Sequence, residues 1–393
     1  MTRPRAIAAV AHLPVAPLRP ALGGLLALAV GIGIGRFVYT PILPPMMAAL
    51  GLSTFAAGLI ASANFAGYLA GALLAARGRL PGGRRVWLLA GLGASAVTTG
   101  AMGLTRALSA FLALRFAGGV ASAVVLILVS AIVLECLAEA RRSDLSALLF
   151  AGVGSGVAAS ALLVSVLQAT GGGWSVLWLA SGGLSALGAL AAAWLIPAAA
   201  GPPPTAAAAA AVAAAAPTDR RLVRLAVAYG LFGFGYVITA TFLVAIVRGT
   251  AALRPLEPVV WVVFGLAAAP SVALWTALAR RIGISGAFAL AALTEALGVL
   301  ASVAWPSAAG VFLAAVLVGG TFMGLTALGL VRGRELARGD ARQVLALMTS
   351  AFGLGQILGP SFAGALSDRL GSFLVPSIVA AAALVAAAAL ASR

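Results

Sequence analysis

Three charged residues interrupt long apolar stretches of the sequence, and their chemistry is the most informative. Arg36 and Glu295 each lie inside a run that holds no other charge, and Arg115 lies inside a run whose other charge, Glu135, is at its very end. A guanidinium presents a planar fork of donors that suits a carboxylate, so two such groups at a similar depth would form an anion site. A carboxyl group within an apolar segment is a candidate proton site.

Composition argues against several other kinds of chemistry. The chain has one histidine, His12, and one cysteine, Cys136, so neither a histidine–cysteine metal cluster nor a Ser-His triad is expected. Glycine pairs such as Gly353 and Gly355 do not mark a nucleotide loop, because no strand precedes them and the chain has no lysine. We therefore expect no metal, no cofactor and no enzymatic activity.

The elements that hold these groups are predicted to be membrane-spanning helices. Of 393 residues, 63% are hydrophobic and 9% are charged, whereas soluble domains carry about 25% charged residues. This composition excludes a soluble enzyme, a disordered chain and a disulfide scaffold, and it does not fit an outer-membrane barrel. At about 20 residues a span, the length fits roughly a dozen helices in a lipid bilayer.

The apolar runs between charges predict twelve spans. They cover residues 21–46, 54–76, 86–105, 108–135, 145–168, 174–196, 222–247, 258–279, 284–304, 308–331, 342–366 and 373–391.

The net charge of +16 comes mainly from arginines in the loops between the predicted spans. All the basic residues are arginines; nineteen fall in the loops of one side and four in the loops of the other. The positive-inside rule then places both termini in the cytoplasm, as an even number of spans requires. We expect a multi-pass protein of the inner (plasma) membrane and no nucleic-acid partner.

The chain repeats itself at an offset of about 200 residues. The sequence GIG at 33–35 corresponds to GFG at 233–235, and FLA at 111–113 corresponds to FLA at 312–314. Six spans in each half give the halves the same orientation, which is the arrangement of parallel repeats. We expect a cytoplasmic tail (1–20), a six-helix bundle (21–196), a Pro/Ala-rich cytoplasmic linker (197–219) and a second six-helix bundle (220–393).

Three segments resemble a known family. Residues 35–46 read GRFVYTPILPPM, residues 64–71 read NFAGYLAG and residues 150–156 read FAGVGSG. They resemble the YbfB/YjiJ-type branch of the major facilitator superfamily, and Arg115 with Phe116 and Gly119 resembles the fourth-span arginine motif of the wider superfamily. The resemblance covers residues 21–391. It implies an all-α membrane protein with the major facilitator fold, in which two pseudo-symmetric six-helix bundles surround a cavity. It also implies transport by alternating access.

The loop between the second and third spans departs from the superfamily pattern. That pattern has an aspartate where this chain has Ala75. A gating carboxylate is therefore missing there. Asp368 and Arg369, after the eleventh span, resemble the same pattern but are predicted to lie on the outer side.

We expect the substrate to contact polar and aromatic residues of the spans that line the cavity. The candidates are Arg36, Tyr39, Asn64, Tyr68, Arg115, Tyr236, Thr239 and Gln356, with Glu295 as the candidate for proton coupling. Each could instead be structural, through hydrogen bonds between helices. The expected hinge and packing residues are Gly152, Gly154, Gly156, Gly353, Gly355, Gly359 and Pro360.

The sequence thus predicts a secondary transporter of a small solute. The first hypothesis is an organic anion that binds Arg36, with proton coupling as a further hypothesis. The alternative is an exporter of neutral or amphiphilic solutes such as sugars or drugs, in which Tyr68 and Trp261 would bind the solute and Arg36 would be structural. A channel is disfavoured because the spans are too apolar.

Overall fold

The computed structural model describes residues 17–76, 83–197, 219–337 and 341–392. Within these ranges it is all-helical, and twelve helical segments are long and apolar enough to span a membrane. The predicted class and number of spans are therefore confirmed. Most of the predicted tail and linker lie outside the described residues, as do residues 77–82 of the loop between the second and third spans.

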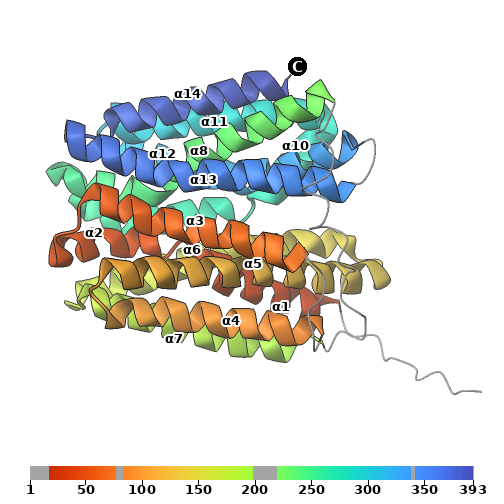
Figure 1. Ribbon diagram of the computed structural model, residues 1–393, viewed down its shortest axis with the longest axis horizontal. Coiled ribbons are helices and arrows are strands. Elements are labelled where there is room, and N and C mark those ends of the chain that lie inside the picture. Colours follow the sequence, from red (N-terminus) through yellow and green to blue (C-terminus); the bar gives the residue numbers. More distant parts are fainter. Residues whose placement is uncertain (1–16, 77–82, 198–218, 338–340, 393) are drawn as a thin grey trace, which may run out of the picture.

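The helices form two groups, one from each half of the chain (Figure 1). The first group is α1 (Leu18–Leu28), α2 (Tyr39–Leu50), α3 (Thr54–Ala76), α4 (Arg84–Ala101), α5 (Leu108–Glu139), α6 (Ser146–Ala169) and α7 (Trp174–Leu195). The second is α8 (Arg220–Gly249), α9 (Glu257–Ala268), α10 (Ser271–Ile282), α11 (Ile284–Ala304), α12 (Ala308–Glu335), α13 (Ala341–Leu370) and α14 (Leu374–Ala391). The groups meet where α3 packs on α13 and α6 packs on α9.

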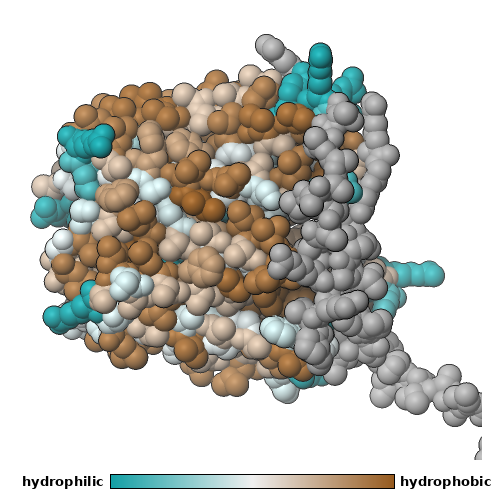
Figure 2. All heavy atoms as spheres, viewed as in Figure 1, coloured by the Kyte–Doolittle hydropathy of each residue, from teal (hydrophilic) through white to brown (hydrophobic). Residues whose placement is uncertain are grey.

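The surface of the molecule is that of a membrane protein. Figure 2 shows apolar residues along the sides of the helices and hydrophilic residues gathered at the two ends. Large apolar side chains such as Leu187, Leu190 and Trp194 of α7 are exposed on the outside of the bundle. Lipid tails would cover this surface in the bilayer, which explains apolar exposure on a scale that a soluble monomer rarely shows.

The first span is broken, whereas the sequence predicts one run over 21–46. Helix α1 passes into a π-helical segment, Ala29–Ile34, and then into a turn over residues 35–38 before α2 begins. Glycines permit this path because the chain approaches α6 closely there; a Cβ atom at Gly33 would lie 2.7 Å from the Cα atom of Gly156. A π-helical segment often marks a functional site, and this one leads into Arg36.

Prolines leave carbonyl groups of the first span without their usual donors. Pro41 and Pro45 have no N–H group, so the carbonyl oxygens of Phe37 and Pro41 lose the helical bond to the residue four positions later. Trp261 donates its indole N–H to the Phe37 oxygen at 3.2 Å, and the Gln168 amide approaches the Pro41 oxygen at 3.5 Å. Side chains from other spans thus compensate the break, as a membrane interior requires.

The eighth span is also divided, whereas the sequence predicts a continuous run over 258–279. Helix α9 ends at Ala268 and α10 begins at Ser271. Pro270 lies between them, and a proline ring both removes a helical hydrogen bond and clashes with the preceding turn.

Contacts between the halves follow the 200-residue offset of the repeat. Thr40 donates its hydroxyl to the carbonyl oxygen of Ala240 at 2.7 Å, so two positions that correspond in the repeat meet each other. The helix pairs that meet across the interface, α6 with α9 and α3 with α13, also correspond to each other in the repeat. Matching positions that meet in this way are typical of a twofold relation between the repeats.

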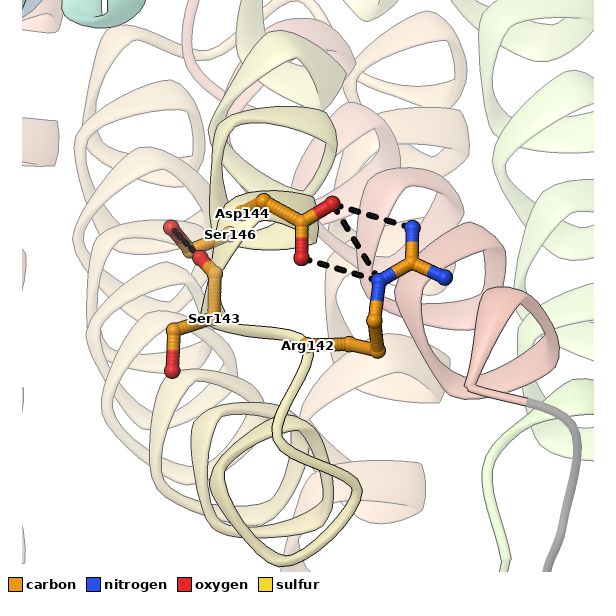
Figure 3. Close-up of polar contacts among 4 residues, drawn as sticks. All are labelled: Arg142, Ser143, Asp144 and Ser146. Atoms are coloured by element: carbon orange, nitrogen blue, oxygen red, sulfur yellow. Dashed lines mark hydrogen bonds and ion pairs between the residues drawn. The ribbon is translucent and has the colours of Figure 1, made fainter.

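The two ends of the molecule differ in their arginine content. We call the end with Arg84, Arg142, Arg220, Arg280 and Arg334 the arginine-rich end, and the end with Arg106, Arg248, Arg254 and Arg369 the arginine-poor end. Ion pairs at the arginine-rich end join residues of the same half. Arg142 and Asp144 in the turn before α6 face each other at 2.9 Å, for example, and both are exposed (Figure 3).

At the arginine-poor end, hydrogen bonds cross between the halves. The Asp368 carboxylate accepts the backbone N–H groups of Thr54 and Phe55, at 2.9 and 2.8 Å, where α3 begins. Deeper in the same interface, Ser62 donates to the Ile357 carbonyl oxygen at 2.6 Å. A carboxylate at a helix N-terminus satisfies free N–H groups and complements the helix dipole. The halves are therefore fastened together at this end.

We expect Asp368→Asn to loosen this contact, because the amide carries no charge and cannot accept both N–H groups. The loss of about 1–2 kcal/mol would raise the population of states open at the arginine-poor end roughly tenfold. The measurement is the rate at which an impermeant thiol reagent labels Ala240→Cys, a buried position at the interface, in a Cys136→Ser background.

Asp144→Asn is the matched control, since Asp144 is an exposed carboxylate whose ion pair stays within one half. Equal labelling rates for the Asp368 and Asp144 variants would contradict a fastening role for Asp368.

Candidate functional site

The centre of the interface holds Arg36 among aromatic rings. Its side chain is 7% exposed. The guanidinium carbon lies 4.4 Å from the ring centre of Tyr68, 4.8 Å from that of Phe65 and 5.8 Å from that of Phe37. Cation–π contacts of a desolvated guanidinium stabilise it by about 2 kcal/mol. The turn at residues 35–38 places Arg36, and one face of α3 supplies both Phe65 and Tyr68, which are three residues apart.

The Arg36 guanidinium has neither a hydrogen-bond acceptor nor a carboxylate partner among the described residues. Its Nε and Nη2 atoms are fully buried and unbonded. Removing an ionised group from water costs several kcal/mol unless a counter-charge or hydrogen bonds compensate it, and the rings compensate only part of this. Arg36 is thus a buried positive charge whose donors are unused.

Arg115 lies nearby and uses two of its three nitrogen atoms within the protein, whereas its buried Nε atom has no acceptor among the described residues. Its Nη1 and Nη2 atoms donate to the carbonyl oxygens of Gly35 and Arg36, at 2.9 and 3.0 Å, where the break in the first span leaves them free. Its guanidinium carbon lies 5.0 Å from the ring centre of Tyr39. Arg115 therefore holds the turn that positions Arg36.

Tyr39 and Asn64 also bond to the backbone. The Tyr39 hydroxyl donates to the Ala57 carbonyl oxygen at 2.8 Å, and Asn64 Nδ2 donates to the Arg115 carbonyl oxygen at 2.9 Å. Asn64 Oδ1 is buried without a donor among the described residues. These two residues join α3 to its neighbours, and the Asn64 oxygen keeps unused hydrogen-bonding capacity.

An aromatic wall, mostly from the second half, adjoins Arg36. The Tyr236 ring stacks between Phe322 and Phe352, with ring centres 5.6 and 5.9 Å away, and Phe37 meets Phe322 edge-on at 5.6 Å. Tyr236 is close enough to Arg36 to interact with it electrostatically. We call Phe37, Tyr236, Phe322 and Phe352 the aromatic wall. Both halves contribute to it, so the site lies between them.

Polar groups of the second half adjoin this wall. Gln356 Nε2 donates to the Tyr236 hydroxyl. Gln356 Oε1 and Thr239 Oγ1 are buried and have no hydrogen-bond partner among the described residues. Buried polar atoms are nearly always bonded, so these two atoms mark places where a bound solute could supply the partner.

Glu295 lies in α11, which packs against α8, the helix that carries Tyr236. Its side chain is 0% exposed, and Oε1 accepts the Thr321 hydroxyl at 3.1 Å while Oε2 has no donor among the described residues. It interacts electrostatically with Tyr236 and forms no ion pair among the described residues. The structure thus places Glu295 near Tyr236, which also interacts electrostatically with Arg36.

The predicted hinge glycines occupy two close helix crossings. A Cβ atom on Gly154 would lie 2.2 Å from the Ala269 nitrogen of the other half, whereas Gly152 and Gly156 face Leu25 and Ala29 of their own half. In the second set, Gly353 faces Leu69 of the other half, Gly355 and Gly359 face Gly230 and Phe234 of their own half, and the Pro360 carbonyl lies against Gly58. These positions allow close packing; their movement as hinges stays a prediction.

Sequence reasoning missed much of the aromatic surface. Phe65 could have been found from its position three residues before Tyr68, and Phe37 from its position beside Arg36. Phe322 and Phe352 carry no such signal, because a phenylalanine in an apolar span looks the same whether it faces lipid, core or cavity.

Comparison with known proteins agrees with this architecture. A family model described as uncharacterised MFS-type transporter YbfB matches residues 28–392. A search of curated proteins gave no match. A crystal structure of a mutant of nucleoside transporter NupG superposes with a TM-score of 0.72 at 16% identity, covering 94% of this chain and 98% of that one. A second NupG structure gives 0.70 at 16%, covering 95% and 98%.

At this level of identity the likeness to NupG shows the fold alone, but the family model spans nearly the whole chain. Together with the twelve spans, the family match indicates a transporter rather than an enzyme. The chain belongs to the YbfB family of MFS-type transporters and is a multi-pass membrane protein with the major facilitator fold.

Proposed function

We propose that this transporter moves a small organic anion, which binds at Arg36 between the two halves. The observation that carries the proposal is the buried Arg36 guanidinium, which lacks a hydrogen bond and a carboxylate partner among the described residues. An anionic ligand would supply both. Ionisable groups inside a membrane protein are expensive to bury, so an unpaired one favours a functional role over a structural one.

The location of Arg36 supports the same proposal. It lies where the broken first span faces the second half, beside a wall to which both halves contribute. Transporters of this architecture bind solutes at the interface of their repeats, often at discontinuous helices. A ligand bound there would contact both halves and so respond to their relative motion.

A second candidate is a neutral polar solute. Asn64 Oδ1, Thr239 Oγ1 and Gln356 Oε1 are buried acceptors without donors among the described residues, and they could bind hydroxyl groups. The structural neighbours include a nucleoside transporter. For such a solute, Arg36 would stabilise the fold and would not bind the solute. The sequence left this alternative open.

Proteoliposomes decide between these candidates. We expect the purified protein to exchange radiolabelled organic anions from a metabolite panel, and Arg36→Gln to abolish this exchange while leaving the protein folded. Arg142→Gln is the matched control, because it removes an exposed arginine at the arginine-rich end. Exchange of neutral solutes alone, or anion exchange that survives in Arg36→Gln, would overturn the proposal.

We also propose that Glu295 couples transport to protons. Its carboxyl group is enclosed and has one oxygen without a donor, and it lies next to Tyr236 at the wall. Glu295→Gln should keep the hydrogen bond to Thr321 but bind no proton. We expect a pH gradient to drive uptake by the wild type and to have no effect on the variant, while exchange at equal pH continues. A retained response to the gradient would exclude this role.

The distribution of arginine supports an orientation. We propose that the arginine-rich end faces the cytoplasm of a bacterial-type inner membrane, with both termini, the tail (1–20) and the linker (197–219) on that side, and that the two bundles (21–196 and 220–393) move as units. Labelling of single cysteines placed at each end tests the orientation.

A further inference from the structure

We propose that the substrate is a monocarboxylate with a flat, apolar body, bound through the Nε–Nη2 edge of Arg36. This inference rests on the proposed function and narrows it to one class of anion. Three observations lead to it: which donors of Arg36 are free, which donors of Arg115 are occupied, and which side chains surround them.

The two buried nitrogen atoms of Arg36 that lack acceptors, Nε and Nη2, form one edge of the guanidinium. The Nε–H bond and one Nη2–H bond point in nearly the same direction, and both nitrogen atoms are buried without acceptors. Two parallel donors match the two oxygens of a planar carboxylate, which is the bidentate geometry that guanidinium groups favour. A lysine at this position could present a point charge but not this edge.

The free donors of the site match one carboxylate and not two. Arg115 is the other guanidinium close to the site, and its Nη1 and Nη2 atoms already donate to the Gly35 and Arg36 carbonyl oxygens. A second carboxylate would find no second free bidentate edge, because Arg115 keeps only its Nε atom without an acceptor among the described residues. A single carboxylate therefore fits the free donors best.

The surroundings favour a flat apolar body. Phe65 and Tyr68 lie against the guanidinium, and the aromatic wall of Phe37, Tyr236, Phe322 and Phe352 adjoins it. The wall is built of stacked rings, with Tyr236 only 10° and 3° from the planes of its two neighbours. A flat ring that enters such a stack gains stacking contacts that a puckered ring of equal size does not.

The test compares ligands that differ in one property each, by thermal shift and by quenching of tryptophan fluorescence in the purified full-length protein. Phenylacetate and indole-3-acetate are the probes of the proposed class. Benzylphosphonate keeps the ring but carries a tetrahedral dianion, phenylmalonate adds a second carboxylate, cyclohexylacetate replaces the flat ring, and 2-phenylethanol removes the charge.

We expect phenylacetate or indole-3-acetate to bind at least about tenfold more tightly than each of the other four. Arg36→Lys, which keeps the charge and loses the edge, should weaken aromatic monocarboxylate binding about tenfold or more and remove the preference over benzylphosphonate. Arg142→Lys is the control and should bind as the wild type does.

Each contrary result overturns a separate statement. Equal affinity of the wild type and Arg36→Lys for phenylacetate, or tighter binding of benzylphosphonate or phenylmalonate, would overturn the bidentate monocarboxylate and leave the proposed anion transport standing. Equal binding of cyclohexylacetate would overturn the flat body. Failure of both aromatic monocarboxylates to bind at millimolar concentration would overturn the inference as a whole. Binding of 2-phenylethanol alone would overturn the proposed function too. The wild-type comparisons hold even if the lysine variant does not fold.

Discussion

Arg36→Leu is expected to abolish anion transport and, at the same time, to make the protein more stable. The side chain makes no hydrogen bond among the described residues, so its removal leaves no acceptor without a donor. Leucine loses cation–π contacts of about 2 kcal/mol, but it also removes an unpaired buried charge whose burial costs several kcal/mol. The second effect is larger, and we expect a net gain of about 1–3 kcal/mol.

The loss of transport should be large. A charge-assisted pair in a desolvated site contributes about 2–5 kcal/mol, so affinity for an anion should fall by a factor between about 30 and several thousand. The measurements are anion exchange in proteoliposomes and the midpoint of thermal unfolding in detergent. A stabilised variant without transport is the pattern of a residue retained for function at the expense of stability.

The opposite pattern would show a structural arginine. If Arg36→Leu unfolds at a lower temperature than the wild type and loses transport only in proportion to the folded fraction, the guanidinium holds the bundle together, and the anion proposal loses its main support. Anion exchange and thermal unfolding of Arg36→Leu therefore distinguish a substrate-binding role of Arg36 from a structural role, which the sequence could not do.

The sequence predicted the fold because the relevant signals were strong and local. Each span appears as an apolar run between charges, and the 200-residue offset appears in the glycines of corresponding spans. The breaks at residues 29–38 and at Pro270 were missed, since membrane helices tolerate glycine and proline when neighbours bond the freed carbonyl groups. The groups that do so here, Arg115 and Trp261, are far away in the sequence.

The candidate site could be predicted only in part. A charge in an apolar run identified Arg36, Arg115 and Glu295, but it could not distinguish a guanidinium bonded to carbonyl groups from one with free donors. That distinction depends on contacts between residues about 80 positions apart. The aromatic wall is unmarked in the sequence for the same reason, because its rings come from the first, seventh, tenth and eleventh spans.

Arg115→Leu is expected to destabilise the protein, in contrast to Arg36→Leu. It removes two hydrogen bonds from a charged donor and leaves the carbonyl oxygens of Gly35 and Arg36 without donors inside the bundle. Hydrogen bonds of a charged group contribute about 1.5–3 kcal/mol each after desolvation, so the loss should be about 3 kcal/mol or more. The midpoint of thermal unfolding should fall, and Arg115→Lys, which can reach one carbonyl at a time, should be intermediate.

Arg115→Leu should also impair transport, although Arg115 is not expected to contact the substrate. The turn over residues 35–38 sets the position of Arg36, and its two bonds to Arg115 fix that turn. We expect the folded fraction of Arg115→Leu to bind anions more weakly than the wild type, but with the same order of preference among them, since the Nε–Nη2 edge of Arg36 remains present. A changed order of preference would instead place Arg115 in direct contact with the substrate. Because Arg36 and Arg115 are both buried and close to each other, opposite changes in stability in the two leucine variants would assign one guanidinium to the solute and the other to the backbone that carries it.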